Sequence, residues 1–246
     1  MKRMNLYPAF RYRALDSLKG AGAAIVAVAA VVAALTLIAG LWIQNGEREV
    51  GSFGGFSMSM MVMTFVFGIS TVRSDLRLFL QNGIGRASTF AADLLAAAVV
   101  SFALAVAGEL LTVAVQSLPL SMDFKVMDLY QMTFAGGQPL SLGGHLMSGL
   151  LTAALTFSAH LGGMLISLIY ARLSKRGAYL FSFALGFLLM FGIPFAGERT
   201  AEFLMPFLSW MMNSAENLVG TLAGLSLVTA LPVWLLLRHA PLKAGK

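Results

Sequence analysis

Six long apolar runs dominate this chain of 246 residues and constrain its fold more than any other feature. Each run is long enough to cross about 30 Å of hydrocarbon, because an α-helix rises about 1.5 Å per residue. With 58% hydrophobic and only 11% charged residues, the chain cannot hide its apolar surface inside one soluble core. The sequence therefore predicts an all-α integral membrane protein with six transmembrane helices. The runs cover residues 21–43, 53–72, 89–116, 147–170, 178–195 and 217–237.

Two apolar runs need separate treatment. The run 21–43 is too long for the core of a signal peptide and has no clear cleavage site of small residues, so we expect it to remain as the first span. The run 203–212 contains Pro206 and is only ten residues long. This length favours a re-entrant outer segment before the sixth span over a further crossing.

Lysine and arginine between the runs predict the orientation of the chain, because these residues mark the cytoplasmic side. With both termini inside, 14 of the 17 basic residues fall in inner segments, and only Arg48, Lys125 and Arg199 fall outside. The sequence therefore predicts an even number of spans and cytoplasmic termini. The net charge of +6 follows from this topology, and we expect no nucleic-acid partner.

The first 20 residues precede the first span and have an amphipathic pattern. One helical arc carries Leu6, Tyr7, Phe10, Ala14 and Leu18. This pattern predicts a cytoplasmic helix that lies along the inner membrane surface, although a simple basic leader that sets orientation is the alternative. We therefore expect an interfacial helix at 1–20 and one six-span domain at 21–246.

The inner loop between the second and third spans is the only inner loop with internal structure. Residues 73–81 predict a short amphipathic helix, which Asn82 and Gly83 would end. Ser88 or Thr89 could then cap the helix of the third span. The segment GIGRAS lacks both the third glycine of a dinucleotide loop and the Gly-Lys-Ser/Thr of a phosphate loop, which argues against nucleotide binding by this chain.

Leu80, Gly83 and Arg86 form a Leu-x-x-Gly-x-x-Arg turn that leads into the third span, followed by Phe90 and the apolar LLAAAVV. Together with the six spans and the inner termini, this pattern resembles the ABC-2 type permeases, the membrane subunits of a group of ABC exporters. The resemblance implies a bacterial plasma-membrane protein that acts as a dimer, with itself or a sister permease. Because the chain has no Walker motif, ATP and Mg²⁺ would bind to a separate ATPase subunit, and this chain would need no cofactor of its own and would not be an enzyme by itself.

In such permeases the loop between the second and third spans is the coupling helix that docks on the ATPase, and the N-terminal helix braces it. The resemblance therefore implies a coupling surface in this loop. The implied coupling residues are Arg73, Asp75, Leu76, Arg77, Leu80, Gly83 and Arg86. For the three arginines among them, the alternative interpretation is that they set the topology and contact lipid phosphates.

A second group of candidates predicts a path for a hydrophobic or amphipathic substrate, such as a drug, a peptide or a lipid-like molecule. Phenylalanines recur every four residues in the fifth span, and methionines cluster in the second, although contact with lipid or a neighbouring helix would also explain both. Glu109 is costly inside a span and therefore marks either a polar gate, a site for a cationic group or an internal hydrogen bond. The candidate path residues are Met58, Met61, Phe183, Phe187, Phe191, Phe195 and Glu109.

Two other functions are open from the sequence. One is an intramembrane enzyme that uses Glu109 or His160, although helical rise separates these two residues by about 10 Å in depth. The other is a substrate-binding membrane subunit of an energy-coupled importer. The chain has no cysteine, and its three histidines have no metal-ligand spacing to carboxylates, so we expect no metal site.

Overall fold

The computed structural model describes residues 6–44, 52–53, 55–117, 125–187 and 197–239, and these residues are almost entirely helical. Two short strands, β1 (Ser52–Phe53) and β2 (Lys125–Val126), pair in parallel, with Ser52 opposite Lys125. The helices are α1 (Leu6–Gln44), α2 (Gly55–Gln81), α3 (Arg86–Gln116), α4 (Leu129–Thr133), α5 (Leu142–Arg172), α6 (Lys175–Phe187), α8 (Gly197–Asn213) and α9 (Ala215–Arg238).

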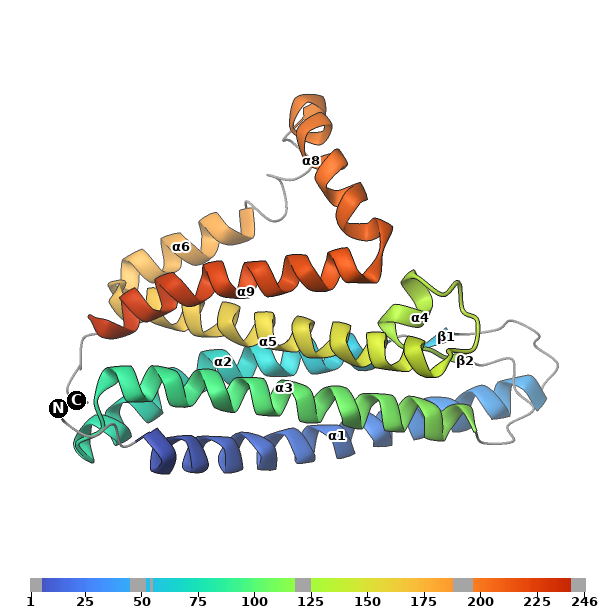
Figure 1. Ribbon diagram of the computed structural model, residues 1–246, viewed down its shortest axis with the longest axis horizontal. Helices are drawn as coiled ribbons and strands as arrows, with labels where there is room; N and C mark the ends of the chain where they lie inside the picture. Colours follow the sequence, from blue (N-terminus) through green and yellow to red (C-terminus); the bar gives the residue numbers. More distant parts are fainter. Residues whose placement is uncertain (1–5, 45–51, 54, 118–124, 188–196, 240–246) are drawn as a thin grey trace.

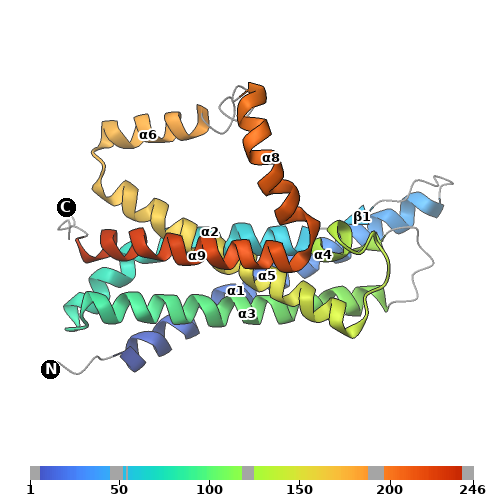
Figure 2. The same ribbon diagram turned by 45° about the horizontal axis from the view of Figure 1, so that its top comes forward.

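The helices α2, α3, α5 and α9 run along the long axis (Figure 1), and α1 packs on α3 while crossing the others obliquely; together they form the bundle. The most extensive contacts join α2 to α5, α1 to α3, and α5 to both α9 and α3. The turn between α2 and α3 lies at one end, the hairpin end, and α4 lies at the other, the α4 end. Figure 2 shows α6 and α8 standing away from the bundle, with α8 joined to the start of α9.

The length and composition of the helices support a multi-pass membrane protein. Four helices, α1, α3, α5 and α9, are long and apolar enough to cross a membrane. α2 becomes a fifth candidate span if its two arms, Phe56–Ser70 and Asp75–Gln81, count as one helix bent by 43°. The predicted fifth span is described only as the 13 residues of α6, since residues 188–196 lie outside the described part. The described structure therefore contains four or five candidate spans, and a sixth remains a prediction.

In the described chain α1 continues from Leu6 to Gln44 without a break, and the division into an interfacial helix at 1–20 and a first span stays a prediction. Neither Gly20 nor Gly22 ends the helix, because glycine in a helix costs only about 1 kcal/mol. Of the expected arc, Ala14 is buried, Leu6, Phe10 and Leu18 are half-buried, and Tyr7 is 69% exposed; Arg13 is buried as well.

The core of the bundle consists of apolar side chains on helices distant in sequence. Between α2, α5 and α9 they form one cluster, and between α1, α2 and α3 they form another. The two clusters are Val72, Leu76, Leu161, Met164, Leu168, Val233 and Leu237, and Ala21, Met60, Val100 and Leu104. α2 and α5 cross where Gly68 meets Gly163, whereas Gly220 and Gly224 on α9 have open space around them.

Candidate functional site

The hairpin between α2 and α3 is a tight turn that the local sequence specifies. The backbone N–H of Gly83 donates to the carbonyl of Leu80 (3.1 Å), and that of Ile84 donates to the carbonyl of Phe79 (2.9 Å). These two bonds form a Schellman motif, which requires a left-handed residue after the helix. Gly83 supplies it with φ +72°. The stop predicted at Asn82 and Gly83 is therefore confirmed.

The start of α3 differs from the sequence prediction. Gly85, with an extended backbone (φ −69°, ψ 154°), is the N-cap residue, and it provides no side-chain hydrogen bond. Ser88 and Thr89, which we expected as caps, already lie inside the helix and are buried. The Thr89 hydroxyl donates back to the carbonyl of Gly85 (3.2 Å). The Schellman turn reverses the direction of the chain so sharply that only Ile84 and Gly85 separate Gly83 from the start of α3.

Apolar contacts fix this hairpin to the N-terminal part of α1. Phe79 and Ile84 from the two sides of the turn pack with Ala9 of α1 and Ala92 of α3 in one buried cluster. Tyr12 of α1 adds an edge-to-face contact with Phe79, with ring centroids 5.9 Å apart. The hairpin is consequently packed against α1 as well as against α3.

A buried arginine makes a second connection between the same three helices. One guanidinium nitrogen of Arg13, Nη1, lies 2.5 Å from Oδ2 of Asp75 on α2, and Nε lies 3.1 Å from Oδ1 of Asp93 on α3. All three residues are nearly inaccessible. Charges buried to this degree need partners, because an unpaired buried ion costs several kcal/mol. We call Arg13, Asp75 and Asp93 the arginine clamp.

The predicted coupling residues divide between the surface and the interior. Arg77 and Gly83 are exposed, together with Asn82 at the tip of the turn. Asp75 and Leu76 are buried, and Leu80 is half-buried. The side chain of Arg73 lies outside the described part of the structure. A docking partner could therefore reach the tip of the hairpin, whereas Asp75 and Leu76 would act from within the bundle.

Arg86 has an intramolecular role that the sequence did not indicate. Its guanidinium donates to the backbone carbonyl of Arg238 in the last turn of α9. Arg172 at the end of α5 donates similarly to the carbonyl of Leu236 (3.1 Å). The carbonyls at a helix C-terminus lack intrahelical partners and carry partial negative charge, so both arginines stabilise the end of α9.

The predicted substrate path is described only in part. Met58 is exposed, Met61 is half-buried, and Phe183 and Phe187 are exposed and stack on each other with centroids 6.3 Å apart. Phe191 and Phe195 lie outside the described residues. The phenylalanines belong to α6, which stands away from the bundle in Figure 2, so a path formed by both groups stays a prediction.

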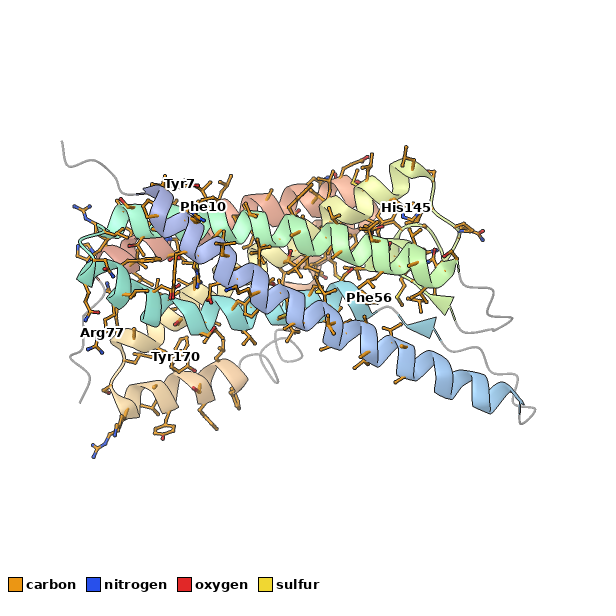
Figure 3. The ribbon with its side chains drawn as sticks, turned by 90° about the horizontal axis from the view of Figure 1, so that it is seen from below. Tyr7, Phe10, Phe56, Arg77, His145 and Tyr170 are labelled. Carbon is orange, nitrogen blue, oxygen red and sulfur yellow. The ribbon has the colours of Figure 1, made fainter. Side chains whose placement is uncertain are left out.

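Glu109 belongs to a polar cluster at the α4 end that the sequence analysis missed. Its Oε2 lies 3.0 Å from Nδ1 of His145 on α5, and its Oε1 contacts the hydroxyl of Ser148. The same hydroxyl lies 2.8 Å from Oδ2 of Asp128, the N-cap residue of α4. We call Glu109, Asp128, His145 and Ser148 the carboxylate cluster. Figure 3 shows His145 at the opposite end of the bundle from Arg77.

Amide groups hold the segment around α4 next to this cluster. The side-chain amide of Gln116 donates to the carbonyl of Val126 (2.8 Å) and to Oε1 of Gln131 (3.0 Å). Gln131 in turn donates to the carbonyl of Gln138 (2.9 Å). These bonds tie β2, α4 and the following turn to the end of α3, so Asp128 has a fixed position beside Ser148.

His160 is not a partner of Glu109 in the structure, which agrees with the predicted difference in depth. It is buried on α5, beside the backbone of Thr64 and within electrostatic reach of Arg13, and its Nε2 has no hydrogen-bond partner among the described residues. An enzyme that uses Glu109 would therefore have to employ His145 as its histidine. The described contact of the His145 ring is with the carboxylate of Glu109, and not with the hydroxyl of Ser148.

Within the described residues, no group of three or more acidic, histidine or cysteine side chains is placed to hold a metal ion. The candidate site consists of two polar centres at opposite ends of one bundle, the arginine clamp and the carboxylate cluster.

Comparisons of the chain with protein-family models, with curated proteins and with solved structures find no match.

Proposed function

We propose that this chain is the membrane permease subunit of an ATP-driven exporter of the ABC-2 type. In this proposal the hairpin end faces the cytoplasm and a separate ATPase subunit, which binds ATP and Mg²⁺, docks on it. A second permease copy or a sister subunit completes the transport path. The cargo is a hydrophobic or amphipathic molecule.

The observation that carries the proposal is the double attachment of the hairpin to α1 and α3. Its tip is exposed at Arg77, Asn82 and Gly83, so a partner has a surface to push on. Its base is fixed by the apolar cluster around Phe79 and by the arginine clamp. Tightly packed interiors shift as discrete units instead of deforming gradually. Displacement of the tip would therefore move α1, α2 and α3 together.

The test is co-purification of the full chain with an ABC ATPase encoded beside it, with ATPase activity recorded in lipid. Arg77→Glu reverses a charge at the exposed part of the hairpin without touching the buried clamp. Arg176→Glu is the matched control, since Arg176 is also exposed and also falls in a predicted inner loop. We expect Arg77→Glu to weaken the complex and lower the lipid-stimulated ATPase rate, and Arg176→Glu to leave both unchanged.

Two results would overturn the proposal. One is the absence of any stable complex between the native chain and the ATPase. The other is an Arg77→Glu variant that binds and stimulates the ATPase like the native chain, together with a Gly83→Pro variant that does the same. The Gly83→Pro variant removes the N–H that donates to Leu80, so it disturbs the turn itself.

A further inference from the structure

Three arginines lie at the hairpin end of the bundle, each at the end of a candidate span. Arg86 is the first residue of α3, Arg172 is the last of α5 and Arg238 is the last of α9, and each also bounds its candidate span. Figures 1 and 2 show these three helix ends at the same end of the bundle. We call Arg86, Arg172 and Arg238 the arginine triad. Its members lie where apolar helices end, which is the level of the lipid headgroups in a membrane.

Two hydrogen bonds bring the triad together at the last turn of α9. The guanidinium of Arg86 donates to the backbone carbonyl of Arg238, and that of Arg172 donates to the carbonyl of Leu236 (3.1 Å). Two residues of a helix span only about 3 Å along its axis. The first two guanidinium groups are therefore bound within one helical turn of each other, and the side chain of Arg238 starts from the same turn.

The triad carries three positive charges without a described counter-charge. Among the described residues, the ion pairs join acidic side chains to Arg13 and His145, and no carboxylate oxygen lies within 4 Å of a nitrogen of the triad. The C-terminus of α9 supplies only about half of a negative charge. Like charges that share one helical turn repel one another, and an anion bound among them removes this repulsion.

The triad also has hydrogen-bond donors left for a ligand. A guanidinium group has five N–H donors. The described bonds use one nitrogen each of Arg86 and Arg172, and none uses the side chain of Arg238. Arg172 and Arg238 are exposed and Arg86 is half-buried, so the remaining donors can meet a group in the headgroup layer. The planar fork of guanidinium donors matches the oxygens of a phosphate.

An exposed apolar face of α9 continues from the triad toward the middle of the span. Leu231 is 66% exposed and Leu235 is 56% exposed, and their spacing places them on the helical face of Arg238. Phe90 and Trp234, with ring centroids 5.3 Å apart, join α3 to α9 one turn inside the triad. Tryptophan is enriched at this depth in membrane proteins. From the helix end inward, α9 therefore presents a cationic group and then apolar side chains, which complements the order of groups in an anionic phospholipid.

We propose that the arginine triad binds the phosphate of an anionic phospholipid, with an acyl chain along the exposed face of α9. In the proposed orientation this end of the bundle meets the cytoplasmic leaflet, whose anionic lipids attract basic residues beside the spans. The phosphate accepts N–H groups from three helices, so it holds α9 to α3 and α5 at their shared end. A zwitterionic lipid binds more weakly, because its own ammonium group offsets the charge of its phosphate.

The experiment uses the full chain in nanodiscs that contain equal amounts of phosphatidylglycerol and phosphatidylcholine with identical acyl chains. Native mass spectrometry of the protein released from the nanodiscs resolves each bound lipid by its mass. We expect one phosphatidylglycerol to stay bound, in about tenfold excess over phosphatidylcholine, since one stronger charge-assisted contact corresponds to about this ratio of affinities. An excess of soluble glycerol phosphate should not displace it, because glycerol phosphate has no acyl chain to bury.

Arg238→Gln tests the triad with little risk to the fold, because its side chain has no described bond and its backbone carbonyl remains available to Arg86. Arg11→Gln is the matched control, since it removes the same charge from an exposed position on α1. We expect Arg238→Gln to lower the excess of phosphatidylglycerol about tenfold and Arg11→Gln to preserve it. Added phosphatidylglycerol should raise the melting temperature in detergent for the native chain and Arg11→Gln, and not for Arg238→Gln.

Neither an ATPase nor a cargo takes part in these measurements, so the lipid site and the proposed transport function can fail separately. Equal retention of the two lipids by the native chain would overturn the lipid site, and this result needs no variant. The same conclusion follows if Arg238→Gln keeps the preference, if Arg11→Gln loses it to the same degree, or if glycerol phosphate displaces the lipid. Should Arg238→Gln not elute as a folded protein, Arg172→Gln replaces it, with the same expected loss.

Discussion

Gly68 on α2 and Gly163 on α5 lie so close together that a methyl group on either would sit 2.2 Å from a backbone carbonyl oxygen of the opposite helix. The oxygen belongs to His160 in the first case and to Phe65 in the second. Helices in lipid gain little from hydrophobic burial against each other, so close backbone contact is a principal source of their association. Among the described helices, the most extensive contact, that of α2 with α5, therefore depends on two residues without side chains.

Gly68→Ala should consequently destabilise the bundle. The added methyl group meets backbone and not a movable side chain, so α2 and α5 must separate, at a cost of about 1–3 kcal/mol or more. Thermal stability in detergent, followed by size-exclusion chromatography, measures the effect. Gly220→Ala is the control, because nothing lies within 4 Å of its new Cβ. Equal stability of both variants would show that the close crossing does not exist.

Arg13→Met should be the most damaging substitution at the hairpin end. It leaves Asp93 buried without the guanidinium that it shares with Asp75, and loss of one partner from a buried ion pair costs about 3–5 kcal/mol. Adding Asp93→Asn should recover part of that loss, since a neutral amide is less costly to bury. Arg11→Met, at an exposed position of the same helix, should have little effect in the same thermal assay. No recovery in the double variant would contradict the clamp.

Gly83→Ala should destabilise the hairpin through its backbone alone. Nothing lies within 4 Å of a Cβ at this position, but its φ of +72° costs a non-glycine residue about 1–2 kcal/mol. Gly85→Ala is a close control, because Gly85 is two residues away, equally open and at φ −69°. Hydrogen exchange of the amides from 79 to 84 would detect the loosened turn in the first variant and not in the second.

The hydrogen bond between Ser57 on α2 and Thr152 on α5 should contribute little, although both side chains are buried and their hydroxyls are 3.1 Å apart. A double-mutant cycle with Ser57→Ala and Thr152→Val isolates their coupling. We expect about 0.6 kcal/mol, since hydrogen bonds between membrane helices average near this value because the unfolded helices also find partners in lipid. A coupling above about 2 kcal/mol would mean that this pair determines the register of the two helices.

Features that depend on neighbouring residues were predictable from the sequence. The stop at Asn82 and Gly83 is one, because a Schellman turn needs only a left-handed residue after a helix. The positions of α3, α5 and α9 followed from the lengths of their apolar runs. The continuity of α1 from Leu6 to Gln44 shows the limit of this approach, since a change from amphipathic to fully apolar composition does not by itself end a helix.

Features that join distant parts of the chain were not predictable. Glu109 and His145 are 36 residues apart, and only the antiparallel packing of α3 on α5 brings them to the same level. Gly68 and Gly163 are single glycines without a small-xxx-small spacing, whereas Gly220 and Gly224 have that spacing, yet a Cβ at either would meet no described atom within 4 Å. Arg13 looked like one of several basic residues that set orientation, and its burial became visible only in the packed bundle.

The arginine clamp also determines how motion would spread along α1. About 46 Å of helix separates Arg13 from the end of α1 at Gln44, at about 1.5 Å per residue. If α1 pivots at the clamp as a rigid rod, a tilt of about 5° moves its far end by about 4 Å. In the proposed transport cycle Arg13 would then act as the pivot of α1, and a small displacement at the hairpin would shift the far end of the helix by several ångströms.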